Sequence, residues 1–181
     1  MLKLNLGAGP GDRNVEGYLS VDIAPPADVL ADLSERWPWD DSSVEHVLAY
    51  DVCEHIGTAV ESSYVGDTAE HADFVLRNVD GRIWFANELW RVLAPGARAI
   101  VETPNASRGC GYWQDPTHCS PWCLSTFKYF EHGAFARERL GDAYGIKARF
   151  KVIGLAEFET NGEDPREKAW KIRAELEAVK P

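Results

Sequence analysis

Residues 3–11 read Lys-Leu-Asn-Leu-Gly-Ala-Gly-Pro-Gly, an apolar run that ends at three closely spaced glycines. A short apolar run that stops at glycine predicts a buried strand followed by a sharp turn. Glycines permit that turn and also let backbone N–H groups approach a ligand closely, so the turn can hold an anion or one edge of a cofactor. A plain tight turn has the same pattern, and the rest of the chain must decide between the two.

Further strands follow along the chain, and their order predicts the fold class. Segments with strand character lie at 18–23, 28–33, 44–50 and 97–103, and several of them end in an acidic residue. Between the last two, apolar residues recur at helical spacing and predict an amphipathic helix over 82–93. Strand, helix and strand in this order imply an α/β fold with a parallel sheet and right-handed crossovers.

The remaining segments are less regular. The polar, glycine-containing stretch 57–81 is predicted to be a loop or short helix beside the top of the sheet, and 104–123 is predicted to be irregular. Both are candidate lid or substrate loops. One or two helices are expected within 124–140, a late strand or hairpin over 148–160, and an amphipathic C-terminal helix over 164–181 that begins at an Asp-Pro pair.

Length and charge restrict the class of protein further. The 181 residues suit a single domain, 1–181, and the 45% hydrophobic content is that of a globular chain. A net charge of −10 disfavours nucleic acid and membrane surfaces as partners. No long apolar run or secretory segment is present, and the four cysteines are unevenly spaced. We therefore expect a cytoplasmic protein with reduced thiols.

An acidic residue at the end of the second predicted strand supports a ligand-binding role for the glycine turn. The Asp22 carboxylate can accept two hydrogen bonds from the adjacent hydroxyls of a ribose. A nicotinamide dinucleotide fingerprint would require glycine where Asp12 stands and would place its acidic residue later in the chain. NAD is therefore disfavoured as the cofactor but stays open.

The combined motifs resemble class I S-adenosylmethionine-dependent methyltransferases, particularly short predicted members from bacteria and phages. The resemblance covers roughly residues 3–119 and implies a three-layer Rossmann-like fold with a mostly parallel sheet, reduced at the N-terminus because the glycine motif begins at residue 4. The stretches that carry it are LNLGAGPG (4–11), GYLSVDI (17–23), ADL (31–33), WPWDDSSVEHVLAYDVCEHI (37–56), NELWRVLAPGA (87–97) and, less securely, QDPTH (114–118).

The resemblance also implies S-adenosylmethionine as cofactor and a set of residues that contact it. The glycine turn would line the methionine and ribose portion, the acidic residue after the second strand would bind the ribose, the ADL segment would face the adenine, and the segment 51–55 would flank the methyl end. The cofactor-binding residues predicted in this way are Gly7, Ala8, Gly9, Gly11, Asp22, Ile23, Asp32, Leu33, Asp51 and His55.

Several of these residues have structural alternatives. Asp51 followed by Glu54 is also the pattern of an N-cap with an acidic residue three positions on, and we favour helix capping for this pair. His55 is either a cofactor contact and catalytic candidate or an ordinary histidine. Trp37 and Trp39 pack either on the adenine edge or in the core.

A second group of residues provides a catalytic candidate. His118 ends the QDPTH segment, in a loop after the fifth predicted strand, where such sheets place substrate-facing segments. Histidine titrates near neutrality and can accept a proton from a hydroxyl or amine as the methyl group arrives. Equally, Asp115 and Thr117 can stabilise a turn while His118 bonds the backbone.

Metal binding is not predicted. Cys110, His118, Cys119 and Cys123 follow the spacing C-x7-H-C-x3-C, which is unusual for zinc and lacks a paired knuckle.

The predicted function is S-adenosylmethionine-dependent methyl transfer to a small-molecule or sugar-like acceptor, by in-line attack on the sulfonium methyl. A non-catalytic S-adenosylmethionine-binding module and an NAD-dependent enzyme are the alternatives. The helices that usually precede the first strand and close over the cofactor are missing from this sequence. We expect the cover to come from 57–81, from 104–123, or from a partner subunit in a homodimer.

Overall fold

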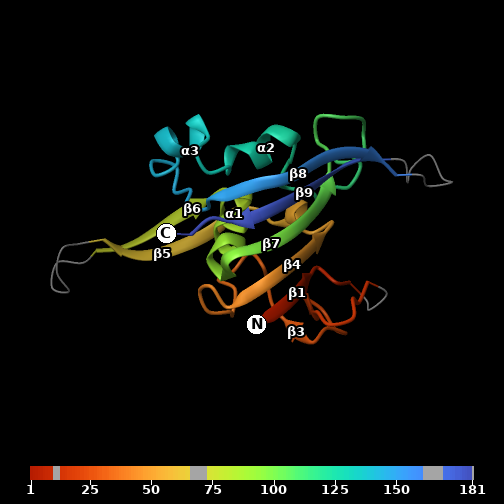
Figure 1. Ribbon diagram of the computed structural model, residues 1–181, viewed down its shortest axis with the longest axis horizontal. Helices are drawn as coiled ribbons and strands as arrows, with labels where there is room; N and C mark the ends of the chain where they lie inside the picture. Colours follow the sequence, from red (N-terminus) through yellow and green to blue (C-terminus); the bar gives the residue numbers. More distant parts are fainter. Residues whose placement is uncertain (10–12, 66–72, 161–168, 181) are drawn as a thin grey trace.

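The computed structural model describes residues 1–9, 13–65, 73–160 and 169–180 (Figure 1). Its main sheet has seven strands: β1 (Leu2–Leu6), β2 (Leu19–Asp22), β3 (Val29–Leu30), β4 (Val44–Tyr50), β7 (Leu93–Pro104), β8 (Phe150–Glu159) and β9 (Trp170–Ala178). They lie in the order β3-β2-β1-β4-β7-β9-β8. Neighbours from β3 to β7 are parallel, whereas β9 is antiparallel to both β7 and β8. The predicted α/β fold with a mostly parallel sheet is confirmed.

The predicted helices agree with the structure in the middle of the chain. The helix expected over 82–93 is α1 (Gly81–Val92), and the Asp80 carboxylate accepts a hydrogen bond from the Arg82 N–H at its start. The segment 124–140 contains two short helices, α2 (Leu124–Tyr129) and α3 (Phe135–Leu140). No helix in the described part of the chain is long and apolar enough to cross a membrane.

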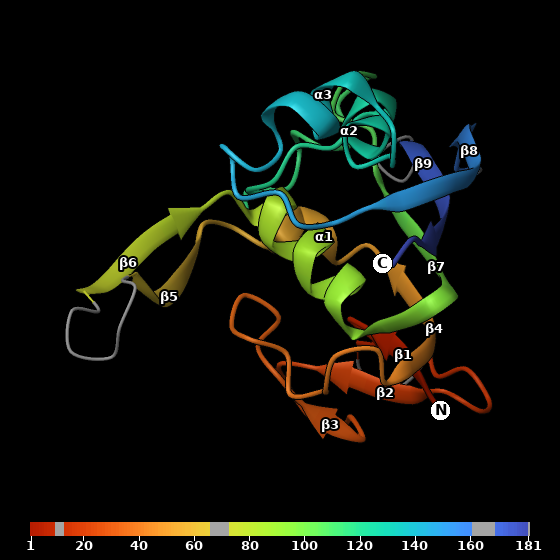
Figure 2. The ribbon, with the colours of Figure 1, turned by 60° about the vertical axis from the view of Figure 1, so that its left-hand side comes forward.

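One face of the sheet is apolar and carries the core. Val47 of β4 pairs with Ala99 of β7, Ala174 of β9 lies two residues from the partner of Ala99, and all three are fully buried on this face. Phe85 and Leu89 of α1 belong to the same buried cluster. Figure 2 shows α1 lying against the sheet, with α2 and α3 beyond it on the same side. Burial of this face therefore positions all three helices.

The opposite face is polar and short connections cross it. Tyr18 hydrogen-bonds His46 (Oη to Nδ1, 3.0 Å), Lys3 lies over the Tyr18 ring, and Asn5 donates to the Arg13 carbonyl. In the described residues no helix precedes Cys53. The side chains of this face are polar enough to lie in water without a covering helix.

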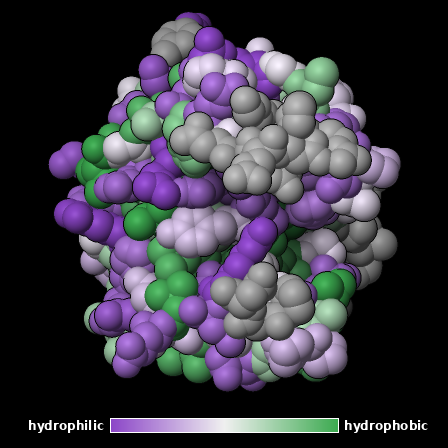
Figure 3. Space-filling model, turned by 90° about the vertical axis from the view of Figure 1, so that its right-hand side faces the viewer, coloured by the Kyte–Doolittle hydropathy of each residue, from purple (hydrophilic) through white to green (hydrophobic). Residues whose placement is uncertain are grey.

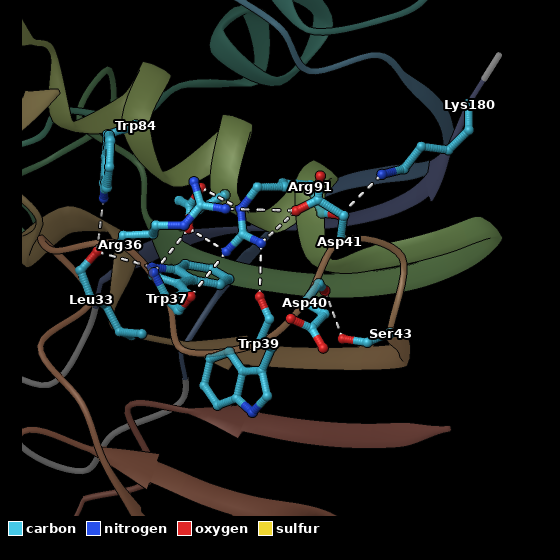
Figure 4. A network of polar contacts seen from close by, with 11 residues as sticks. Leu33, Arg36, Trp37, Trp39, Asp40, Asp41, Ser43, Trp84, Arg91 and Lys180 are labelled. Atoms are coloured by element: carbon cyan, nitrogen blue, oxygen red, sulfur yellow. Dashed lines mark hydrogen bonds and ion pairs between the residues drawn. The ribbon is translucent and has the colours of Figure 1, made fainter. Parts of the chain in front are cut away.

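The connection from β3 to β4 replaces a helix with an anchored loop (Figure 4). The Arg91 guanidinium on α1 donates to the carbonyls of Trp37 and Trp39 and pairs with Glu88 (2.7 Å). The Trp37 N–H in turn donates to the Glu88 carboxylate. Both indoles are buried, so these hydrogen bonds hold the loop and its two tryptophans in the core.

The segment 57–81 differs from its prediction. Instead of a loop or short helix, it contains an antiparallel strand pair, β5 (Ala59–Val65) and β6 (Asp73–Val79), which extends away from the main sheet (Figure 2). Antiparallel strands need only one apolar face, so they lack the continuous apolar runs of buried parallel strands. The strands were missed because their apolar residues do not alternate regularly with polar ones.

The predicted C-terminal helix over 164–181 is wrong, because β9 occupies the middle half of that segment, while 164–168 and 181 lie outside the described residues. Ile172, Ala174 and Leu176 point into the core, and the intervening Arg173 and Glu175 are exposed. Buried and exposed side chains therefore alternate along this segment, as they do in a strand. Ile172 and Leu176 are four residues apart, which satisfies helical and strand spacing equally, and the place between β7 and β8 selects the strand.

Candidate functional site at the carboxyl ends of the strands

The predicted site residues gather at the carboxyl ends of β1, β2, β3 and β4. Figure 3 looks onto this end of the molecule, where hydrophilic and hydrophobic side chains lie side by side. In open α/β sheets ligands bind at this edge, where the strand order reverses. Here the order reverses at β1, between β2 and β4.

The glycine turn after β1 is held by tight packing and by one carboxylate. Gly7 and Gly9 have φ angles of 64° and 67°, and a Cβ on Gly7 would lie 2.7 Å from the Cβ of Val52. The Gly9 N–H donates to Asp22 Oδ2 (2.9 Å), and the Ala24 N–H donates to Asp22 Oδ1 (3.1 Å). Backbone hydrogen bonds on both oxygens thus fix the Asp22 carboxylate at the end of β2.

A cavity of about 210 Å³ opens next to this turn. It brings together six of the ten predicted cofactor residues: Gly7, Asp22, Ile23, Asp32, Leu33 and His55, together with Ala31, Ser34, Val52 and Ile56. Ala8 is buried behind the turn and its N–H donates to Val21, while Asp51 lines a different cavity. Gly11 lies outside the described residues.

At the expected adenine end, Asp32 lines the cavity, whereas the Leu33 carbonyl is already hydrogen-bonded within the core. Asp32 Oδ1 accepts hydrogen bonds from the N–H and the hydroxyl of Ser34. The Leu33 carbonyl turns inward and accepts both the Trp37 and the Trp84 indole N–H (Figure 4). Trp37 therefore supports the cavity from behind, and the core alternative is correct for it.

The turn after β4 is where sequence reasoning about capping fails. Its 3-10 helix, η1 (Cys53–His55), has Val52 at the N-cap position and no side-chain capping bond. Asp51 instead adopts a φ of 53° and pairs with Lys171 (Oδ2 to Nζ, 2.6 Å). Capping of this helix by Asp51 and Glu54 is therefore wrong, because the chain makes only one turn and both side chains are used elsewhere.

Glu54 is a functional candidate that sequence analysis did not single out. Its side chain is fully buried, Oε2 accepts a hydrogen bond from the Thr103 hydroxyl (3.0 Å), and Oε1 has no partner. Burial raises the pKa of Glu54 to about 7, and the nearby Asp51 carboxylate adds to the rise. The signal in the sequence was a carboxylate placed between Cys53 and Ile56, both of which are buried.

A second cavity of about 340 Å³ adjoins the first, and His55 lines both. Its wall combines the turn after β4, the loop before α2 and the start of β9. The lining residues are Arg13, Asp51, Glu54, His55, Pro104, Gly111, Gln114, Asp115, His118, Ala169 and Lys171. Several residues of the predicted irregular loop 104–123 therefore face this cavity.

The QDPTH segment forms the turn that the structural alternative describes. Asp115 Oδ1 accepts from the N–H and the hydroxyl of Thr117, and the His118 ring bonds the Tyr112 carbonyl (Nδ1 to O, 2.7 Å). Since a carbonyl only accepts, Nδ1 carries the proton and Nε2 keeps a free lone pair. The backbone contact thus leaves His118 able to accept a proton.

The two loops are joined to each other. The Glu54 carbonyl accepts hydrogen bonds from the N–H groups of Cys119 and Ser120, and the His55 and His118 rings lie edge to face, with centroids 4.8 Å apart. In the described residues the cysteines form no cluster with metal-ligating side chains, whereas ligand atoms of Glu54, His55 and His118 lie within 4.8 Å of one another.

A third cavity, of about 360 Å³, lies between the start of α1 and α2. It shares no lining residue with the other two and contains none of the predicted residues. Volume alone therefore does not identify the site.

Comparisons with known proteins agree with this fold. No protein-family model matches the chain, and no curated protein matches it. A solved S-adenosylmethionine-dependent methyltransferase from Methanosarcina mazei superposes with a TM-score of 0.60 at 14% identity, covering 99% of this chain and 92% of that one. One from Archaeoglobus fulgidus gives 0.56 at 15% identity, with 97% and 85% covered.

A third solved structure carries a cofactor product. The N-methyltransferase NodS from Bradyrhizobium japonicum, in complex with S-adenosylhomocysteine, superposes with a TM-score of 0.56 at 10% identity and covers 98% of this chain and 78% of that one. The chain therefore has the fold of S-adenosylmethionine-dependent methyltransferases. At these identities the likeness extends to the fold and not to the acceptor.

Proposed function

We propose that the protein is an S-adenosylmethionine-dependent methyltransferase that acts on a small-molecule or sugar-like acceptor. The observation that carries this proposal is the pair of adjoining cavities that share His55. The cavity beside the glycine turn suits the cofactor, and its neighbour suits the acceptor. A methyl group at their junction would have its nucleophile in the second cavity and its sulfonium in the first.

The proposed cofactor contacts follow from the first cavity. Asp22 would bind the ribose hydroxyls through carboxylate lone pairs that remain after its two backbone hydrogen bonds. Asp32 and the Leu33 N–H would face the adenine, and Gly7 would admit the methionine portion because no side chain stands there. His55 would flank the methyl end.

The proposed reaction uses positioning and one proton acceptor. The acceptor oxygen or nitrogen forms a bond to the methyl carbon while the bond from that carbon to sulfur breaks, and S-adenosylhomocysteine leaves. The proton of the acceptor passes to His118 Nε2, whose tautomer is set by the Tyr112 carbonyl. Orientation of the two reactants supplies most of the rate enhancement, about 10⁵ to 10⁸ M in effective molarity, and the base adds about 10² to 10⁴-fold.

Charge supports the choice of acceptor class. The chain carries a net charge of −10, and the cations on the acceptor cavity, Arg13 and Lys171, both approach Asp51. No free positive surface for a phosphate backbone is therefore built here by the described residues. An uncharged hydroxyl compound fits this wall best.

The test is a parallel calorimetric titration with S-adenosylhomocysteine, S-adenosylmethionine and NAD. We expect saturable binding of the first two and none of NAD. Binding of NAD alone would overturn the proposal. Incubation with S-adenosylmethionine and a library of hydroxyl and amine acceptors then separates an enzyme from a binding module, because only an enzyme releases S-adenosylhomocysteine in an acceptor-dependent way.

A further inference from the structure

Three electron-pair donors lie together at the junction of the two cavities. A nitrogen of His55, a nitrogen of His118 and a carboxylate oxygen of Glu54 lie within 4.8 Å of one another. They come from two loops that are more than sixty residues apart in the chain and are joined by the hydrogen bonds on the Glu54 carbonyl. The proximity is therefore a property of the tertiary structure.

Hydrogen-bond partners leave several acceptor atoms of this cluster without a donor. The Thr117 hydroxyl donates to Asp115, so it accepts from His55 Nδ1–H (3.1 Å), and His118 Nδ1–H donates to the Tyr112 carbonyl. In its neutral form each ring therefore carries its lone pair on Nε2. Glu54 Oε1 is buried and has no hydrogen-bond partner in the described structure. These lone pairs suit a bound cation.

The supporting contacts are of the kind that metal ligands have. Ligating histidines usually donate their other ring N–H to a carbonyl, a carboxylate or water, which fixes the ring orientation. Thr103 holds Glu54 and the Tyr112 carbonyl holds His118, whereas His55 is exposed and its ring nitrogen is held by one hydroxyl. Two ligands are thus fixed and the third can adjust.

The remaining gap is small. Ligand atoms about 2.0 to 2.2 Å from a metal lie roughly 3.0 to 3.5 Å apart. Closing the present separation of up to 4.8 Å needs a small shift of the ligating side chains, and His55, which is exposed, has the most room to move.

We propose that Glu54, His55 and His118 bind a divalent first-row transition metal such as Zn²⁺, Co²⁺ or Mn²⁺. Two imidazoles and one carboxylate suit such ions and leave coordination positions open. Those positions face the acceptor cavity, where an acceptor hydroxyl would occupy one of them. This role in catalysis rests on the proposed function, but the ligand set does not.

Metal binding would give His118 a different task. With the metal bound, His118 is a ligand and the proton of the acceptor has another destination. Asp115 is the nearest carboxylate, with Oδ2 3.7 Å from His118 Nε2. A metal ion and a proton would thus compete for His118 Nε2, and the experiment below distinguishes the two cases.

The experiment uses the full chain without a histidine tag, freed of metal by a chelator. Co²⁺ is titrated while its visible absorption is followed, and Zn²⁺ is titrated by calorimetry. We expect one equivalent to bind with saturation. Loss of a supporting contact alone costs about 10 to 100-fold in metal affinity, so Glu54→Gln and His118→Gln should each lose at least that much. His132→Gln, an exposed histidine beside Glu138, is the matched control and should bind normally.

Unchanged Co²⁺ affinity in both variants, or the absence of saturable binding to the parent protein, overturns the proposal. If Glu54→Gln does not fold, as circular dichroism would show, His55→Gln takes its place, because that side chain is exposed. S-adenosylhomocysteine is titrated separately. If the protein binds S-adenosylhomocysteine but no metal, only the metal site is overturned. If it binds metal but no S-adenosylhomocysteine, only the proposed function is overturned.

Discussion

The two adjoining cavities are built in different ways. The cofactor cavity is lined by turns at the ends of successive strands, all within the first 56 residues, and the hydrogen bond from the Gly9 N–H to Asp22 beside it joins residues only thirteen apart. The acceptor cavity is assembled from side chains of three distant segments, and its Lys171–Asp51 pair spans 120 residues. Local geometry thus dictates the first cavity and long-range packing dictates the second. His118→Gln and Asp22→Ala, below, are each expected to affect one cavity and to spare the other.

The largest effect is expected in the acceptor cavity. His118→Gln should lower the rate of methyl transfer about 10² to 10⁴-fold, because the proton acceptor, or the ligand, is lost. S-adenosylhomocysteine affinity, measured by calorimetry, should stay within about twofold because His118 does not line the cofactor cavity. A parallel loss of cofactor affinity would show that the two cavities are not separable.

The next effect tests the backbone of the cofactor cavity. Gly7→Ala places a Cβ 2.7 Å from Val52 at a φ of 64°, so overpacking and backbone strain together should destabilise the fold by about 2 to 5 kcal/mol. Gly17→Ala is the control, because Gly17 also has a positive φ but no atom lies within 4 Å of its Cβ position. Urea unfolding of both variants isolates the clash. Equal losses would mean that Val52 yields without cost.

A smaller effect is expected at the ribose contact. Asp22→Ala removes charge-assisted hydrogen bonds of about 1.5 to 3 kcal/mol, and S-adenosylhomocysteine should bind about tenfold to a hundredfold more weakly. Asp115→Ala, on the wall of the acceptor cavity, should leave that affinity unchanged. Calorimetric titration measures both, and normal binding by Asp22→Ala would contradict the ribose assignment.

The smallest effect lies outside both cavities, on the polar face of the sheet. Burial lowers the pKa of His46 below its usual 6.5, and the neighbouring Lys3 and Arg98 charges add to this. The folded state therefore holds a neutral ring that the unfolded chain protonates, so stability present above pH 6.5 declines as the pH falls through that value. Urea midpoints at pH 7.5 and 5.5 measure the slope.

His46→Gln should reduce that slope while cofactor affinity stays normal, since His46 lines neither cavity. A slope identical to that of the parent protein would assign the acid sensitivity to another group. The variant also provides the background against which pH effects at the site are measured.

The parts of the fold that sequence predicted are those with a single consistent period. The strand expected over 44–50 is β4 residue for residue, and the helix expected over 82–93 starts and ends one residue earlier as α1. In β9, by contrast, Ile172 and Leu176 satisfy both periods, and only neighbouring strands on both sides select the extended form. The strand pair β5 and β6 was missed because its apolar residues occur in clusters, such as Phe74–Leu76, and do not alternate with polar ones.

The sequence by itself determined the α/β class, the glycine turn and the carboxylate that holds it, because residues close along the chain and joined by short connections leave few alternatives. Only the tertiary structure decided that Glu54 is buried beside Thr103, that His118 bonds the Tyr112 carbonyl and that both lie next to His55. Whether a carboxylate lies in water or against an apolar wall depends on which distant segment covers it. That segment is chosen by packing of the whole sheet, which no local pattern encodes.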